Sequence, residues 1–394
     1  MIAITNAKVY PVSTAPIERG TILLDGHTIA AVGPAGEIAI PAGATVIDAA
    51  GKVVTPGLID PHTHLGISEE GIGWEGRDYN EMTNPITPHL RAIDGINPEE
   101  QGLRDAAANG ITTVITGPGS ANVLGGESVA IKTYGHIIDH MVVRQPAGLK
   151  GAFGENPKRV YDQQKKIPTT RMGTAALLRK ALVDAQNYLS KWERWEQGGK
   201  DPDKQPERNL EMETVVRVVK REIPLRAHAH RADDLMTAIR IADEFNIIVT
   251  LEHATESHKI AEEIARRGLV CVVGPGLTSR SKVELRDRTI DTPRVLFENG
   301  IKFALCTDHP VIPIQYLPLY AAMAVRAGLP VDAALRAMTM DAADIIGVGD
   351  RLGSLDSGKD ADVVIWSHFP LDSRAVAEKV FINGELVPEG YGEA

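Results

Sequence analysis

The sequence is poor in cysteine and in long apolar runs, and its acidic residues outnumber its basic ones. Its two cysteines among 394 residues, Cys271 and Cys306, each lie in an apolar, strand-like run. This pattern indicates two buried thiols in a reducing compartment rather than a disulfide. No apolar run approaches the roughly 20 residues that a membrane span requires, and the first six residues do not resemble the start of a secretory signal. We therefore expect a cytoplasmic protein.

The charge and length limit the kinds of partner and fold. A net charge of −10 argues against nucleic acid or an anionic membrane surface as a partner. Hydrophobic residues make up 43% and charged residues 24% of the chain, which is typical of a soluble globular protein. The length suits one barrel of roughly 250 residues plus an accessory domain.

The two ends of the chain share one pattern of short strand-like runs separated by turns. Asp25-Gly26 lies between two such runs and predicts a hairpin. Each set of strands is too small to bury its own faces, so the two sets are expected to pack together. The sequence therefore predicts a composite β-sandwich domain from residues 1–53 and 352–394.

Between these ends, apolar strand-like runs alternate with helical patterns, which is typical of a parallel sheet. The fold class that follows is α/β: a (β/α)8 TIM barrel over residues 54–351, joined to the small β-sandwich. The helices are expected at about residues 171–197, 209–221 and 232–245. The eight expected strands are residues 58–64, 111–116, 128–132, 147–153, 225–230, 247–253, 269–273 and 302–308.

The first of these strands ends in two histidines, His62 and His64, with one residue between them. Side chains two apart on a strand point to the same face, so both imidazoles converge on one point. Two nitrogen donors already placed side by side favour a transition metal. Other strands also end in residues that can bind metal, and function in such barrels gathers at the C-terminal strand ends. These residues are His228 with His230, His253 and Asp308.

The segment Pro-Gly-Leu-Ile-Asp-Pro-His-Thr-His, residues 56–64, resembles the first-strand signature of the amidohydrolase superfamily. Residues 353–362 resemble the C-terminal signature of the same superfamily. The resemblance implies metal-dependent hydrolysis on a (β/α)8 barrel. By residue, it implies that His62, His64, His228, His253 and Asp308 bind metal, that Asp308 is also the catalytic base, and that His230 contacts substrate or the metal-bound water.

The fourth strand decides between one metal ion and two. Lys150 lies in this strand, in a context that resembles the lysine segment of imidazolonepropionase-like and prolidase-like binuclear members, although Gly151 is smaller than the residue usual there. The resemblance implies an N6-carboxylysine at Lys150 that bridges two ions. Lys132 and Glu155 are the alternatives. Zinc is the default metal, with iron, manganese and nickel also compatible.

These features predict a hydrolase of amide or lactam C–N bonds, acting on an N-acyl amino acid, a dipeptide or a cyclic amide. One alternative is a mononuclear deaminase of a cyclic amidine, and another is a non-catalytic scaffold, against which the full ligand set argues. Arg231, and Arg280 with Lys282, are candidates to bind a substrate carboxylate. Residues 66–97 form a long acidic segment after the first strand, in which Trp74 and Tyr79 either cover substrate or bury against another subunit of a homo-oligomer.

Overall fold

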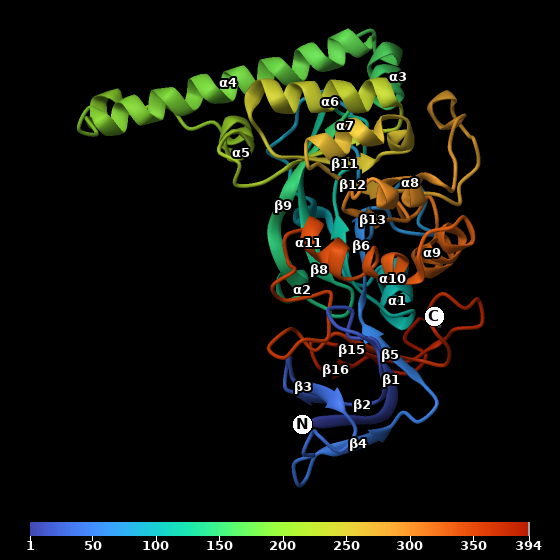
Figure 1. Cartoon of the computed structure of the whole chain (residues 1–394). Helices are drawn as coiled ribbons and strands as arrows, with labels where there is room; N and C mark the ends of the chain where they lie inside the picture. Colours follow the sequence, from blue (N-terminus) through green and yellow to red (C-terminus); the bar gives the residue numbers. More distant parts are fainter. Residues whose placement is uncertain (393–394) are drawn as a thin grey trace.

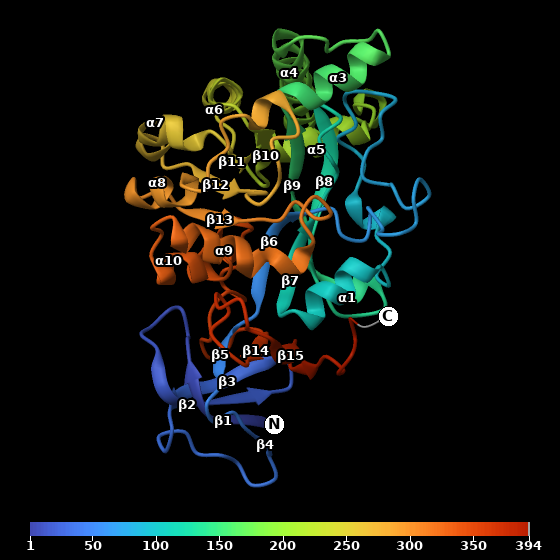
Figure 2. The same ribbon diagram turned by 90° about the vertical axis from the view of Figure 1, so that its right-hand side faces the viewer.

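The structure of the protein, a computed structural model, describes residues 1–392 and contains two large sheets. One sheet is a nearly closed barrel, and the other is built from both ends of the chain. Figures 1 and 2 show the terminal sheet at one end of the molecule and the long helix α4 (Arg171–Gln197) at the other. The site described below lies where the C-terminal ends of several barrel strands meet.

The terminal sheet confirms that the two ends of the chain fold together. Its strands are hydrogen-bonded in the order β16-β15-β14-β5-β1-β2-β3, with β4 paired to β1, so pairing connects them into a single sheet. The N- and C-terminal parts meet where β5 pairs with β14 antiparallel. The strands are β1 Ile2–Val9, β2 Ile17–Asp25, β3 Thr28–Pro34, β4 Thr45–Asp48, β5 Val53–Pro56, β14 Val363–Trp366, β15 Ala377–Ile382 and β16 Glu385–Leu386.

The barrel sheet contains all eight strands expected from the sequence. They are hydrogen-bonded in chain order, and most of their residues are buried on both faces. The strands are β6 Leu58–Thr63, β7 Ile111–Thr116, β8 Leu124–Lys132, β9 Val142–Ala152, β10 Leu225–Ala229, β11 Val249–His253, β12 Val270–Val273 and β13 Phe303–Leu305.

The first and last barrel strands are joined through a connecting segment. Ile59 of β6 donates its N–H to the Met338 carbonyl at 2.7 Å, and Leu305 of β13 donates to the Ala337 carbonyl at 3.0 Å. At the mouth of the barrel, the buried Asp60 carboxylate accepts from the backbone N–H of Thr307 at 2.9 Å and from its hydroxyl at 2.6 Å. These bonds hold the end of β13 against β6, where the metal-capable residues of both strands lie.

The third barrel strand, β8, is antiparallel, although the sequence predicted a parallel barrel. β8 pairs antiparallel with both β7 and β9, whereas the other neighbouring strands of the barrel are parallel. Only residues 117–123 connect β7 to β8, and a parallel connection needs a crossover of about a dozen residues or more. The C-terminal end of β8 therefore lies at the end of the barrel opposite the mouth.

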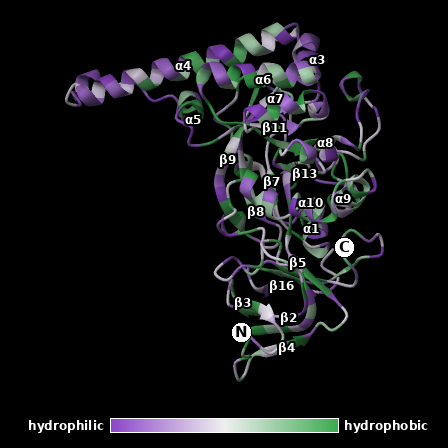
Figure 3. Ribbon diagram, viewed as in Figure 1, coloured by the Kyte–Doolittle hydropathy of each residue, from purple (hydrophilic) through white to green (hydrophobic). Residues whose placement is uncertain are grey.

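The helices follow the predicted positions closely. Helix α4 spans Arg171–Gln197, as expected, and begins where the Thr170 hydroxyl accepts from the Gly173 N–H at 3.0 Å. Its buried residues lie in its first half, and the remainder extends past α5 with a largely hydrophilic surface (Figure 3). The other α-helices are α1 Gln101–Ala108, α2 Ile138–Met141, α3 Glu155–Gln163, α5 Leu210–Val219, α6 Ala232–Phe245, α7 Ala261–Arg266, α8 Thr292–Glu298, α9 Leu317–Arg326, α10 Val331–Arg336 and α11 Met340–Ile345. Among residues 1–392, no helix is both long and apolar enough to cross a membrane.

Candidate metal centre and active-site cavity

A cavity of about 580 Å³ opens at the mouth of the barrel, and most of the predicted site residues line it. Its size is within the range of cavities that bind small molecules. The predicted metal-binding and catalytic residues that line it are His64, Lys150, His228, His230, His253 and Asp308.

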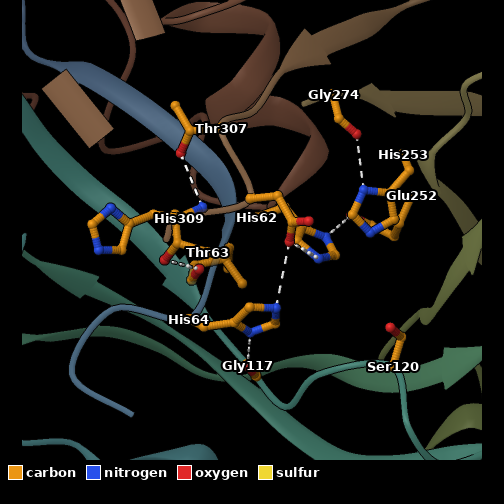
Figure 4. Close-up of polar contacts among 12 residues, drawn as sticks. His62, Thr63, His64, Gly117, Ser120, Glu252, His253, Gly274, Thr307 and His309 are labelled. Carbon is orange, nitrogen blue, oxygen red and sulfur yellow. Dashed lines mark hydrogen bonds and ion pairs between the residues drawn. The ribbon is translucent and has the colours of Figure 1, made fainter. Parts of the chain in front are cut away.

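His62 in β6 and His64 just after it are each held in one tautomer by a partner from another part of the barrel (Figure 4). His62 Nδ1 lies 2.7 Å from a carboxylate oxygen of Glu252, and His64 Nδ1 lies 2.7 Å from the Gly117 carbonyl. Because an ionised carboxylate and a carbonyl can only accept, both Nδ1 atoms carry the proton. In each ring Nε2 therefore carries the lone pair, and Nε2 is the atom that would bind a metal ion.

His253 at the end of β11 is arranged in the same way. Its Nδ1 donates to the Gly274 carbonyl at 2.8 Å, which leaves Nε2 for the cavity (Figure 4). His228 differs, because both of its ring nitrogens are buried and have no hydrogen-bond partner among residues 1–392. Burial lowers the pKa of His228 well below its ordinary value, so the ring is neutral at pH 7.

Two overlapping groups of donor atoms result. The first contains His228, His230 and His253, and the second contains His62, His253 and Asp308. Within each group the donor atoms lie within 4.8 Å of one another, and His253 belongs to both. Neutral imidazoles with a carboxylate suit a borderline divalent ion, and the unpartnered nitrogens of His228 are what such an ion would satisfy. The residues therefore fit a metal.

Asp308 follows β13 and reaches the same point from the other side of the cavity. Its Oδ1 lies 3.4 Å from His64 Nε2 and 3.7 Å from His62 Nε2. Burial alone would raise the pKa of Asp308, but the His253 and His64 rings outweigh it and hold the pKa well below its usual range. Asp308 and His253 both have positive φ, of 55° and 66°. Such backbone conformations are costly outside glycine and cluster at functional sites.

Lys150 of β9 lies at the bottom of this cluster. Its Nζ is 3.0 Å from His62 Nε2, and the residue is only 2% exposed. Burial lowers the pKa of Lys150 to about 8. The amine is therefore much more easily deprotonated than an ordinary lysine side chain.

A buried pair of charged residues beside the site, Glu252 and Arg226, was not recognised in the sequence. Glu252 of β11 binds His62 Nδ1 and also accepts from Arg226 of β10 at 3.1 Å. Arg226 in turn donates to the Pro61 carbonyl at 2.5 Å, and both charged side chains are buried. Burial alone would raise the pKa of Glu252, but Arg226 and His62 outweigh it and lower the pKa to about 2. Charged residues inside two otherwise apolar strands were the signal that could have identified this pair.

The two alternatives to Lys150 lie elsewhere. Lys132 ends β8, and its Nζ is 2.8 Å from Asp362 and 3.1 Å from Asp360, which precede β14. The reversed direction of β8 explains this position at the opposite end of the barrel. Glu155 is the first residue of α3 and belongs to neither donor group.

The structure separates most of the predicted substrate residues from the cavity. Tyr79 lines it and stacks on the His64 ring with centroids 5.4 Å apart, whereas Trp74 is 85% exposed and does not line it. Arg231 forms an ion pair with Asp233 beside a separate hollow. Arg280 does not line the cavity either, because its guanidinium is bonded to two carbonyls of its own loop.

Two basic side chains other than Lys150 line the cavity, Lys282 and Arg159. Lys282 lines the cavity and pairs with the buried Glu284 at 2.7 Å. Arg159 of α3 also lines it, and sequence reasoning did not identify it. Arg159 lies on a helix rather than at a strand end, so the strand-end pattern carried no signal for it.

Comparisons with known proteins agree with this geometry. The amidohydrolase family model matches residues 53–387. Amidohydrolase tasK of Hapsidospora irregularis is 30% identical over 392 residues, which cover 93% of this chain and 39% of that protein. Imidazolonepropionase of Geobacillus thermodenitrificans (strain NG80-2) is 28% identical over 382 residues, covering 89% and 84% of the two chains.

A solved structure extends the likeness to the whole fold. The crystal structure of an amidohydrolase from Thermotoga maritima MSB8 is 43% identical and has a TM-score of 0.95, covering 98% of this chain and 100% of that one. Together with the family match over residues 53–387, this likeness shows that the chain is an enzyme of the amidohydrolase family.

Proposed function

We propose that the protein is a metal-dependent hydrolase of amide or lactam C–N bonds in small molecules. The observation that carries the proposal is the convergence of imidazole lone pairs and one ionised carboxylate on one cavity. His62, His64, His253 and Asp308 would hold a first ion, with His228 available for a second. A bound divalent metal, with zinc the default, supplies an activated water and polarises the scissile carbonyl.

The protein side chains perform the proton transfers and positioning. The Asp308 carboxylate is ionised and faces the point where the imidazoles converge, so it can take a proton from the attacking water and return it to the leaving nitrogen. His230 lines the cavity, and its Nδ1 is hydrogen-bonded to the Thr255 hydroxyl at 2.8 Å. This bond orients the ring so that Nε2 can bind a polar group of the substrate.

The second ion depends on Lys150. Carbamate formation needs a neutral amine, and a pKa of about 8 makes the neutral form of Lys150 far more abundant at pH 7 than in an ordinary lysine. We therefore propose N6-carboxylation of Lys150 and a binuclear centre. Elemental analysis of the purified enzyme should find about two metal ions per chain, whereas one ion with an unmodified lysine would favour the deaminase alternative.

The reaction products separate the two functions. Amide or lactam hydrolysis yields a carboxylic acid and an amine, whereas deamination of a cyclic amidine releases ammonia. We expect the metal-loaded enzyme to release amine from N-acyl amino acids or dipeptides. Asp308→Asn should reduce turnover by about 10²- to 10⁴-fold, which is the usual contribution of a positioned general base. Ammonia release from cyclic amidines, with no amide cleavage, would contradict the proposal.

We also propose a homo-oligomer located in the cytoplasm. Both cysteines are free and buried, which agrees with a reducing compartment. Trp74 is too exposed to line the cavity, which favours a contact with another subunit. If this is so, Trp74→Ala should alter sedimentation, and a change in kcat/KM alone would show that Trp74 belongs to a lid.

A further inference from the structure

The charged side chains around the cavity do not balance. Outside the proposed metal centre, whose ligands include Lys150 and Asp308, two cations line it, Arg159 and Lys282. Lys282 is compensated by Glu284 at 2.7 Å. Arg159 is therefore the uncompensated positive charge of the cavity wall.

Helix α3 places Arg159 on the face that lines the cavity. Asn156, Arg159 and Val160 all line the cavity, and their spacing of three and four residues places them on one face of the helix. Asn156 donates to the Ser120 hydroxyl at 2.8 Å. On another face, the buried Tyr161 donates its hydroxyl proton to the Asn122 side chain at 2.5 Å. These two bonds tie the helix to the segment between β7 and β8.

The guanidinium of Arg159 is free to bind a ligand. Among residues 1–392, Arg159 takes part in no ion pair and no side-chain hydrogen bond, although it lines a cavity. Arg231 and Arg280, in contrast, are engaged by their own loops. A planar guanidinium offers parallel N–H donors that match the two oxygens of a carboxylate. Arg159 is exposed, while His228 and His253 are buried, so it lies nearer the mouth than the metal-capable histidines.

We propose that the substrate carries a carboxylate on the amine side of the scissile C–N bond and that Arg159 binds it. This inference rests on the proposed function and narrows it to N-acyl amino acids and dipeptides, as opposed to neutral cyclic amides. Apolar side chains from several parts of the cavity wall provide room for an apolar substituent. They are Met82, Val160, Leu285 and Val311.

The test compares free acids with their uncharged carboxamides. The substrates are N-acetyl and N-formyl leucine, methionine and phenylalanine, each in both forms, and released α-amine is measured with fluorescamine. The variants are Arg159→Gln and Arg159→Lys. Lys158→Gln is the matched control, because Lys158 is the adjacent cation of the same helix and does not line the cavity.

We expect Arg159→Gln to lower kcat/KM for the acids by about 10- to 100-fold, the effect of losing a charge-assisted pair. The carboxamides should be hydrolysed equally by Arg159→Gln and the parent enzyme. On the acids, Arg159→Lys should have a kcat/KM between those of Arg159→Gln and the parent, and Lys158→Gln should match the parent. Equal losses on acids and carboxamides, or no loss on the acids, would overturn the inference.

Failure of the proposed function can be told apart from failure of this inference. If no member of the panel is hydrolysed, amide hydrolysis of this class is refuted, and binding of N-acetyl-L-leucine and its carboxamide is measured by isothermal titration calorimetry. Tighter binding of the acid that is lost in Arg159→Gln would still support the carboxylate site. Equal binding of both forms, or binding of neither, would overturn it.

Discussion

Replacing Glu252 with Gln would leave Arg226 as a buried charge without its carboxylate partner. The two residues are 0% and 1% exposed, and their closest charged atoms are 3.1 Å apart. At an effective dielectric constant of about 20, a charge pair at this distance attracts by about 5 kcal/mol before the cost of desolvation. Removing one partner of a buried pair lowers the free energy of unfolding by about 3–5 kcal/mol.

The same substitution should weaken the metal site. The Glu252 carboxylate accepts the Nδ1 proton of His62 and thereby directs Nε2 to the cavity. Losing such a partner reduces metal affinity by about 10- to 100-fold. In the double variant with Arg226→Met, the unpaired charge is gone, so most of the lost stability should return while metal affinity stays low.

Urea unfolding of the metal-free proteins measures the first effect, and competition with a chelator measures the second. The control is Glu213→Gln, which makes the same chemical change in the ion pair of Glu213 with the exposed Arg208. An exposed pair contributes about 1 kcal/mol or less, so this variant should stay close to the parent. If Glu252→Gln were as stable as the control and bound metal as tightly as the parent, the assigned role of Glu252 would be refuted.

Two further changes test other parts of the structure. Burial lowers the pKa of Lys150 from 10.5 to about 8, so between these pH values the unfolded chain binds more protons than the folded one. The free energy of unfolding of metal-free protein in CO2-free buffer should therefore rise by about 3 kcal/mol from pH 8 to 10.5. Lys150→Met should abolish this rise. If the rise were unchanged in Lys150→Met, it would come from another group. Lys132→Met leaves Asp360 and Asp362 without their shared cation. Urea unfolding should therefore show a free energy of unfolding that is lower by about 3 kcal/mol, with the metal content unchanged. A loss of metal would contradict the position of Lys132 outside the site.

Much of the fold was predictable because the hydrophobic pattern of each strand or helix is set by residues that are close together in the sequence. The barrel strands are apolar runs bounded by glycine, proline or polar residues, and all eight formed where expected. Helix α4 was predicted with its observed bounds. The direction of β8 was missed, because a strand buried on both faces has the same apolar pattern whichever way it runs. The seven residues between β7 and β8 were the available signal, since they are too few for a helical crossover.

The sequence singles out site residues where function coincides with strand ends. The structure brings His62, His64, His228, His253 and Asp308 together because the barrel strands bring their ends to one mouth. Their role as metal ligands stays a prediction. Contacts between side chains on different strands or helices depend on how those elements are aligned in space, and the sequence alone does not give this alignment. Glu252 meets His62 across the barrel, and Arg159 reaches the cavity from a helix that follows β9.

The metal content of His253→Ala tests the central claim most directly. His253 belongs to both groups of donor atoms, so its loss should leave the purified protein with almost no bound metal by elemental analysis. The exposed His136, which pairs with Glu99 outside these groups, provides the control, and His136→Ala should keep the parent content. Circular dichroism of both variants should show an unchanged fold. A folded His253→Ala protein with the full metal content of the parent would contradict the account.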